Sequence, residues 1–320
     1  MKSPPPISLL IPCYQAERFL PRLMRSVRAQ TRPFAEIVAY DDGSTDHTVA
    51  IAEDLGITVY EGGENRGVSH ARNQLAAAAR CEWIHFHDPD DELSPQFLER
   101  LAAECDARRD VVTCDADWID EDTGQLEIAW RYDTAALASD PVASLVERPM
   151  SLNNALINRD RWLVVGGCDE ALDRWEDADV TLRLALDGAT FFHVPEVLTH
   201  AHRRKDSLSA DPVSNSRSRL AYLQKLADHP RLVRLRSQLA VQAERTAVDL
   251  LDQGDARSAA VAARLAQHLG ARLPSSSRGV WSLVRPWVPG FTLLRIQSWI
   301  RRNRSRAAPP PRSTRSTSSP

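Results

Sequence analysis

The sequence lacks the features of a disulfide-bonded, zinc-binding or membrane-spanning protein. Its five cysteines are an odd number, and none forms a Cys-x-x-Cys pair or the His/Cys spacing of a zinc site. No run of 18 or more apolar residues is present, and the opening Met-Lys-Ser-Pro-Pro-Pro has no apolar signal-peptide stretch. We therefore expect reduced thiols, a cytoplasmic location and no membrane span.

Acidic residues are missing from the last 50 positions. Residues 271–320 contain ten Arg and no Asp, Glu or Lys, although the 320-residue chain has a formal net charge of only −3. Within this stretch, residues 280–306 also carry three tryptophans and a phenylalanine. Such a segment suits a peripheral contact with the inner face of the plasma membrane, or docking onto protein. Nucleic acid is not expected, because the preceding body is acidic.

The first hundred residues alternate between strand-like and helix-like patterns. Short apolar runs predict strands at 7–11, 36–40, 57–61 and 83–86, each followed by a helical pattern. The order β-α-β-α-β-α-β predicts a parallel sheet with helices on both faces, and ligands bind such sheets at the carboxyl ends of the strands. The residues at these ends should meet at one crevice; they are Asp41, Asp42, Asn65, Arg66, Asp88, Asp90 and Asp91.

The fourth predicted strand leads into Asp88-Pro89-Asp90-Asp91. If Pro89 keeps the backbone extended, Asp88 and Asp90 project to one side and can share a hard divalent cation. The alternative is a solvated turn before a helix that Ser94 caps and Pro95 begins. This segment alone favours neither interpretation.

Further along the chain, the patterns continue the α/β order and then become helical. Strands are expected at 110–118, 125–130, 155–158 and 191–194, and helices at 94–108, 161–165 and 178–186, whereas 133–150 could be a surface helix or a loop. Two or three amphipathic helices follow over 216–270, with breaks at His229-Pro230 and Gly254-Asp255. We expect a main domain at 1–212, a helical extension at 213–272, a basic aromatic segment at 273–306 and a disordered tail at 307–320.

Four motifs in this order resemble the family 2 glycosyltransferases over roughly residues 6–210. They are Ile7–Glu17 (ISLLIPCYQAE), Ala39–Asp46 (AYDDGSTD), Glu64–Asn73 (ENRGVSHARN) and His85–Asp91 (HFHDPDD). The resemblance implies the GT-A fold, a Rossmann-like and mostly parallel sheet flanked by helices. It also implies an inverting enzyme of polysaccharide or cell-envelope biosynthesis. Such an enzyme moves a sugar from a nucleotide-diphosphate donor, expected to be UDP-linked, to a hydroxyl of a glycan or lipid-linked acceptor.

The resemblance also assigns residues to the donor. Asp42 matches the carboxylate that reads the base and ribose, and Arg72 matches an arginine that faces the nucleotide. Other positions matching the nucleotide-sugar site are Pro12, Tyr14, Glu17, Asn65 and Asp88. Asp90 matches a direct ligand of Mg²⁺ or Mn²⁺, with Asp88 or Asp91 as further ligands of the same ion. A packed turn, helix capping and a solvated helix face remain alternatives for Tyr14, Asp42 and Arg72 respectively.

On the acceptor side, Gly166–Asp179 is similar to the family's Gly-Gly-x-Asp-Glu segment and Glu-Asp motif. Asp177 falls on the general base, with Glu176 as the second choice and Asp179 as the third; an acidic helix amino terminus is the alternative. In Thr199–Ser209, His202 and Arg204 stand where the family has Arg and His. Either could hold diphosphate oxygens, or the loop could simply be solvated.

Two other functions compete with this interpretation. A nucleotidyltransferase on a similar fold would need a Gly-rich basic loop after the first strand, where this chain has Pro-Cys-Tyr-Gln. A catalytically inactive nucleotide-binding scaffold need not keep the carboxylates Asp42, Asp90 and Asp177, all of which are present. We treat His47, His70, His85 and His87 as structural or exposed.

Overall fold

The structure, a computed structural model, describes residues 4–204, 211–272, 291–296 and 298–299. Its internal contacts divide the chain into two compact units, Met1–Tyr222 and the part from Leu223 onward. Most of the expected basic aromatic segment and all of the tail 307–320 lie outside the described residues. The five cysteines are all free thiols, as expected.

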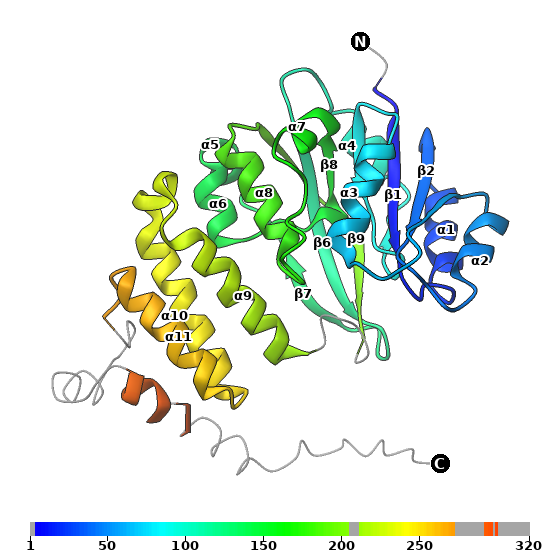
Figure 1. Cartoon of the computed structure of the whole chain (residues 1–320). Helices are drawn as coiled ribbons and strands as arrows, with labels where there is room; N and C mark the ends of the chain where they lie inside the picture. Colours follow the sequence, from blue (N-terminus) through cyan, green and yellow to red (C-terminus); the bar gives the residue numbers. More distant parts are fainter. Residues whose placement is uncertain (1–3, 205–210, 273–290, 297, 300–320) are drawn as a thin grey trace, which may run out of the picture. The chain divides into compact units, whose positions relative to one another are not determined.

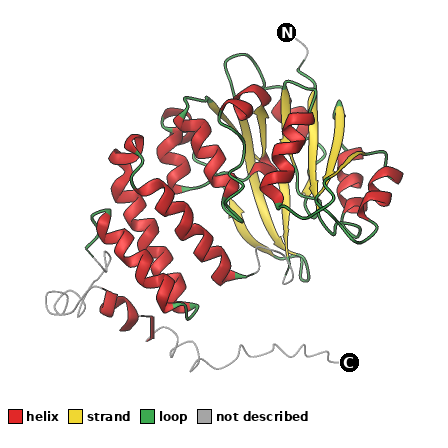
Figure 2. Ribbon diagram, viewed as in Figure 1, coloured by secondary structure: helices red, strands yellow, loops and turns green. Residues whose placement is uncertain are grey.

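The first unit contains a nine-stranded sheet flanked by helices (Figures 1 and 2). The strands lie in the order β3-β2-β1-β4-β8-β6-β9-β5, and β7 pairs with β6. Their bounds are β1 Ile7–Cys13, β2 Glu36–Asp41, β3 Thr58–Glu61, β4 Trp83–Phe86, β5 Glu92–Leu93, β6 Val111–Asp120, β7 Leu126–Trp130, β8 Ala155–Asn158 and β9 Phe191–Arg203. The predicted α/β fold is confirmed.

The four strands β1 to β4 pair in parallel, as their apolar patterns predicted. All seven residues of β1 are buried, because this central strand has neighbours on both edges and helices on both faces. The helices of this half are α1 Leu20–Arg28, α2 Thr48–Asp54, α3 Val68–Ala78 and α4 Phe97–Ala102. Leu20, Leu23, Met24 and Val27 of α1 form the predicted apolar stripe and join the core.

The other half of the sheet is mixed. β8 is antiparallel to both β4 and β6, β9 is parallel to β6, and β6 and β7 form the predicted hairpin. β9 is much longer than the expected strand at 191–194, because it pairs with β6 up to Asp120 and Arg203 and also with β5. This pairing carries residues 200–204 to the acidic loop that follows β4.

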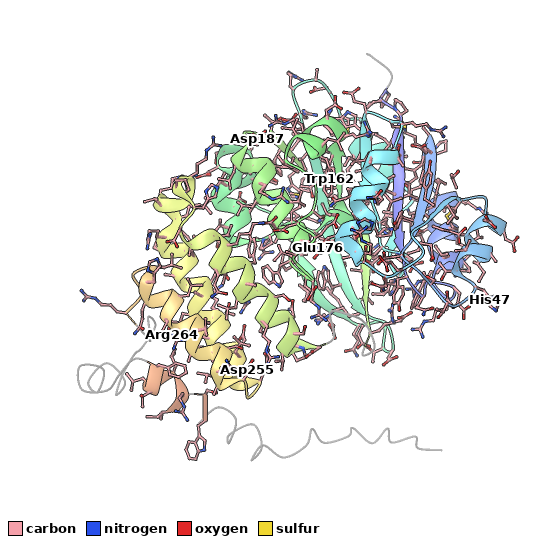
Figure 3. The ribbon with its side chains drawn as sticks, viewed as in Figure 1. His47, Trp162, Glu176, Asp187, Asp255 and Arg264 are labelled. Atoms are coloured by element: carbon pink, nitrogen blue, oxygen red, sulfur yellow. The ribbon has the colours of Figure 1, made fainter. Side chains whose placement is uncertain are left out.

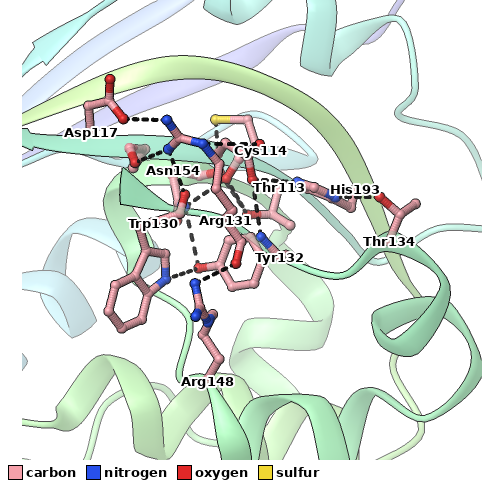
Figure 4. Close-up of polar contacts among 12 residues, drawn as sticks. Thr113, Cys114, Asp117, Trp130, Arg131, Tyr132, Thr134, Arg148, Asn154 and His193 are labelled. Carbon is pink, nitrogen blue, oxygen red and sulfur yellow. Dashed lines mark hydrogen bonds and ion pairs between the residues drawn. The ribbon is translucent and has the colours of Figure 1, made fainter. Parts of the chain in front are cut away.

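A polar network fixes the hairpin against its neighbours (Figure 4). The Arg131 guanidinium donates to the Asp117 carboxylate over 2.6 Å and to the Ala116 carbonyl over 2.6 Å. Buried His193 contacts the Thr134 hydroxyl on one side, at 2.8 Å, and the Asp115 carboxylate on the other, at 3.0 Å. Because buried polar groups need partners, this network specifies how β6, β9 and the segment after β7 pack.

The hydroxyl groups that precede α2 and α4 in the sequence do not cap these helices. Ser44 and Thr45 do not cap α2; their hydroxyls accept hydrogen bonds from the Gln15 backbone and side chain, both at 2.9 Å. Ser94 does not cap α4, which begins at Phe97. Residues 92–93 pair with β9, and this pairing holds the Ser94 hydroxyl 3.2 Å from His200.

The stretch 133–150, which could be a surface helix or a loop on sequence grounds, contains two short helices. Asp133 caps the first and Asp140 the second, each accepting a backbone N–H three residues later. The remaining helices of the first unit are α5 Thr134–Ser139, α6 Pro141–Glu147, η1 Leu152–Asn154, α7 Arg159–Val164 and α8 Glu176–Leu186. The predicted helix at 178–186 is confirmed as α8.

The second unit is helical, as expected. α9 (Pro212–Ala227) crosses the boundary between the units and is followed by η3 (Pro230–Leu235), α10 (Arg236–Asp252) and α11 (Ala256–His268). The breaks fall at His229-Pro230 and Gly254-Asp255, where the sequence places them. Alanines of α10 and α11 are almost fully buried, which permits close helix packing. Among the described residues, no helix is long and apolar enough to cross a membrane.

Candidate active site

Asp42 connects two of the loops that were expected to meet at one crevice, the loop after β2 and the loop before α3. Its carboxylate is almost fully buried and accepts hydrogen bonds from the backbone N–H groups of Arg66, at 3.0 and 3.1 Å, and Gly67, at 2.7 Å. Gly67 has φ +94°, a conformation that favours glycine, and is the N-cap of α3. Asp42 therefore fixes the amino terminus of α3 to the end of β2, while Asn65 in the same loop is exposed.

The three residues expected after the first strand have different environments. Pro12 lies within β1 and is buried opposite Tyr40, so its expected place on the loop is wrong. Tyr14 is 49% exposed. The Glu17 carboxylate accepts the His47 N–H over 2.9 Å, and thereby ties this loop to the one after β2. Only Tyr14 thus presents a large open surface.

The segment Asp88-Pro89-Asp90-Asp91 is a turn, which is the second of the two alternatives that the sequence left open. The Asp91 N–H donates to the Asp88 carbonyl over 3.2 Å, which closes the turn. Asn153 bridges its carboxylates, with its side-chain amide 3.1 Å from Asp88 Oδ2 and 2.5 Å from Asp91 Oδ2. The other Asp91 oxygen accepts the His202 N–H over 2.9 Å.

Arg204 forms an ion pair with Asp90, the second carboxylate in this turn. Arg204 Nη1 lies 2.9 Å from Asp90 Oδ2, and the same guanidinium lies over the Phe19 ring and 3.5 Å from Glu121. Burial and the neighbouring Asp88 charge raise the pKa of Asp90, while Arg204 opposes the rise. His202, by contrast, directs its ring toward Glu92, with Nε2 and Oε2 2.8 Å apart.

Arg72 connects the acidic turn to the second acidic motif. Its side chain is 5% exposed, and its two terminal nitrogens lie 2.8 Å from Asp88 Oδ1 and 2.5 Å from Glu176 Oε1. The nearby Asp88 and Glu176 charges raise the pKa of Arg72 despite its burial. Figure 3 shows Glu176 at the amino end of α8. A single buried guanidinium therefore joins the loop after β4 to the start of α8.

Asp177 has the electrostatic character of a base. Burial, together with the adjacent Glu176 charge, raises its pKa to about 7, while Arg72 opposes that rise. Its Oδ1 accepts the Ala178 N–H over 2.7 Å. Asp179, the third choice for the base, instead binds Arg183 Nε over 2.7 Å within α8. A carboxyl with a pKa near 7 can take up a proton at neutral pH.

The backbone immediately before this motif is strained. Trp175, the N-cap of α8, has φ +68°, which is costly for a bulky residue. Residues of α9 hold it: the indole N–H donates to Asn215 Oδ1 over 2.9 Å, and the ring stacks on Tyr222 with centroids 5.6 Å apart. The Tyr222 hydroxyl also donates to the Ala178 carbonyl over 3.4 Å. The start of α9 thus fixes the direction of the Glu176-Asp177 segment.

The sequence did not predict that Asn153, Trp175 and the ion pair Arg22–Glu121 hold the acidic motifs in place. The charged groups of that pair are 2.7 Å apart. Arg22 also donates to the Asp90 carbonyl. Asn153 and Arg22 carry no local signal of this role, whereas the Trp next to Glu-Asp could have been noticed. His85 and His87 are fully buried in the core and His47 is exposed, as expected for structural or exposed residues.

Among the residues that the structure describes, no three His, Cys, Asp or Glu side chains are arranged as a metal site. Both Asp91 oxygens already accept hydrogen bonds in a buried position, so Asp91 does not fit a direct ligand role. The Asp88 and Asp90 side chains are partly exposed, at 32% and 25%. These two carboxylates fit a divalent cation better.

Solved structures share this fold. This chain matches the structure of residues 1–349 of S. aureus TarS in complex with UDP-GlcNAc, with a TM-score of 0.66 and 19% identity. The match covers 94% of this chain and 91% of the TarS chain. This chain also matches the mannosyltransferase PcManGT of Pyrobaculum calidifontis, in complex with GDP-Man and Mn²⁺, with a TM-score of 0.60, 17% identity and coverage of 94% and 88%. At these identities the likeness shows the fold, which is the expected GT-A fold.

Sequence comparison gives the family. The putative glycosyltransferase EpsH of Bacillus subtilis is 33% identical over 127 residues, which are 38% of this chain and 36% of EpsH. The chain thus matches about a third of that relative's length. Residues 8–169, just over half of the chain, match the profile of Glycosyl transferase family 2. The chain therefore belongs to glycosyl transferase family 2.

Proposed function

We propose that the protein is an inverting glycosyltransferase that moves a sugar from a nucleotide-diphosphate donor to a hydroxyl of a glycan or lipid-linked acceptor. The family supports the reaction class, and the UDP-GlcNAc complex of TarS supports a UDP-linked donor. The observation that carries the proposal is the Arg72 bridge, which places the Asp88 carboxylate and the Glu176-Asp177 motif on one buried cation. A transferase needs its donor-binding residues and its base close to each other, as Asp88 and the Glu176-Asp177 motif are here.

Asp177 acts as the general base. Its carboxyl, with a pKa near 7, takes the proton of the acceptor hydroxyl as that oxygen attacks the anomeric carbon. Glu176 is a poorer candidate, because its carboxylate is engaged by Arg72. The contacts of Trp175 with α9 fix the orientation of the Glu176-Asp177 motif, and this favours a constant distance between the base and the acceptor hydroxyl.

The donor lies across the carboxyl ends of β1, β2 and β4. Asp42 shapes the base and ribose end by holding the amino terminus of α3 in place, and the exposed Tyr14 ring lies at this end together with Pro12, Glu17 and Asn65. Arg204 binds the diphosphate, because its guanidinium already stands beside the acidic turn. His202 supports Asp91 through its backbone N–H and remains a weaker candidate for the diphosphate.

Mg²⁺ or Mn²⁺ is the proposed cofactor, held by Asp90 and Asp88. The structure supports this assignment because burial and mutual repulsion raise the pKa of Asp90, so a nearby cation would stabilise its charged form. PcManGT was solved with Mn²⁺. When bound, such an ion stabilises negative charge on the departing diphosphate. Asp91 stabilises the turn through its hydrogen bonds with Asn153 and His202 and does not bind the ion.

Calorimetry with UDP and Mn²⁺, followed by a panel of nucleotide sugars, tests the proposal. Asp90→Ala should abolish metal-dependent nucleotide binding, whereas Asp177→Asn should keep binding and lose turnover. Asp173→Asn, which removes an exposed carboxylate from the loop just before α8, is the control and should change neither. Full activity of Asp177→Asn would place the base elsewhere, and wild-type protein that binds neither UDP nor any nucleotide sugar would overturn the proposal.

We also propose a cytoplasmic location. The five free thiols, four of which are buried, suit a reducing compartment.

A further inference from the structure

The two units carry opposite charge. From Leu223 onward the sequence has 17 Lys and Arg but only 5 Asp and Glu, whereas residues 1–222 have 23 Lys and Arg and 38 Asp and Glu. The charge excess of the second unit plays no part in the proposed transfer reaction. Such an excess attracts an anionic partner.

A short helical segment, residues 291–296 with 298–299, is attached to α10 by one of its faces. Leu293 and Leu294 are each 1% exposed. The Ser298 hydroxyl donates to Asp252 Oδ1 over 2.5 Å. This buried face fixes the segment within the second unit and determines which side chains point outward.

The outward face combines two large apolar side chains with one arginine and one threonine, and it lines a cavity. Thr292, Arg295, Ile296 and Trp299 follow the i, i+3, i+4, i+7 spacing of one helix stripe. Ile296 is 39% exposed and Trp299 is 61% exposed. Together with Leu251, Gly254 and Ala256, the stripe surrounds a cavity of about 350 Å³. An exposed tryptophan and isoleucine at an open, mostly apolar cavity indicate an interaction surface.

We propose that this face docks on an anionic phospholipid bilayer. Trp299 and Ile296 enter the boundary between headgroups and acyl chains, and the cavity receives part of one acyl chain. Arg295, on the same stripe, pairs with headgroup phosphates, and the basic surplus of the unit adds long-range attraction. Nucleic acid would match the charge, but it would not match an exposed isoleucine beside an apolar cavity.

Co-sedimentation of the full chain with vesicles tests the proposal. Vesicles of phosphatidylglycerol and phosphatidylcholine should bind the protein, and vesicles of phosphatidylcholine alone should bind it far less. Ile296→Ser/Trp299→Ser should weaken partition at least about tenfold, because two exposed apolar side chains no longer enter the bilayer. Arg295→Gln should weaken it about fivefold.

Two variants in the first unit are the matched controls. Val164→Ser removes an apolar side chain that is 68% exposed, and Arg108→Gln removes an arginine whose side chain is 83% exposed; neither should change partition. Equal sedimentation of wild type and Ile296→Ser/Trp299→Ser would overturn the proposal, as would wild-type binding to neutral vesicles as strongly as to anionic ones. A chain that sediments with neither kind of vesicle would overturn it too.

Brominated acyl chains locate the contact. They should quench part of the tryptophan fluorescence of the wild type, and less of it in Trp299→Phe, which keeps an aromatic ring and should still bind the vesicles. Unchanged quenching in this variant would refute the assigned orientation. Nucleotide binding in solution is measured without vesicles, so a failure of docking is distinguishable from a failure of the proposed transferase activity.

Discussion

The raised pKa of Asp177 predicts a pH-dependent stability cost. The pKa of its carboxyl rises from 3.8 to about 7 in the folded protein, because burial and the Glu176 charge disfavour the charged form. Below about pH 4 the group is protonated in both the folded and the unfolded state. As the pH rises from about 4 through 7, the unfolded state ionises first and stability is lost. At about 1.4 kcal/mol per pKa unit, the loss reaches on the order of 4 kcal/mol at most.

Urea unfolding of wild type and Asp177→Asn between pH 4 and pH 9 measures this cost. Asparagine keeps the oxygen that accepts the Ala178 N–H but cannot ionise. The free energy of unfolding of the variant should therefore approach that of wild type near pH 4, exceed it by a few kcal/mol at pH 8, and change little above that. Asp173→Asn, in the exposed loop just before α8, should show no such trend. A difference that stays constant with pH would refute the electrostatic account of the base.

Two further predictions concern the supports of this site. Arg72→Gln should destabilise the fold by about 3 kcal/mol in urea unfolding, since it leaves the buried Glu176 and the partly exposed Asp88 without their cation. Arg108→Gln, on an exposed ion pair, should cost under about 1 kcal/mol, and equal costs for the two variants would contradict the Arg72 bridge. Gly166 and Gly167 both have positive φ, but only at Gly167 would an added methyl group collide with the Asn73 amide. Gly166→Ala should therefore cost about 1 kcal/mol and Gly167→Ala about 1–3 kcal/mol more, as thermal unfolding can measure.

The first half of the fold could be predicted because its signals are local. Four apolar runs of the right length, separated by helical patterns, are enough to predict parallel strands with crossover helices. The second half was harder to predict, since β9 extends past 194 through pairing with β6, more than eighty residues earlier, and with β5. A pairing over such a distance leaves no periodic trace in the sequence.

The site residues could be named from motifs, but their partners could not. The sequence could not decide between an extended segment and a turn for Asp88 and Asp90, and Asn153 with a backbone hydrogen bond holds them in a turn. Arg72 was matched to an arginine that faces the nucleotide, but its ion pairs with Asp88 and Glu176 could not be predicted. Each of these contacts depends on tertiary packing, which residue spacing within a motif does not encode.

The position of Arg72 explains how two acidic motifs can lie next to each other. Asp88 and the Glu176-Asp177 pair would repel one another across a poorly solvated space, and that repulsion would favour separating α8 from the loop after β4. A buried guanidinium with two ion-paired ends removes the repulsion, and its planar fork also sets the orientation of each carboxylate. Because Arg72 is engaged on both sides, it neutralises Glu176 and leaves Asp177 as the carboxyl whose pKa is near 7. In the proposed mechanism, the same side chain therefore favours Asp177 over Glu176 as the base.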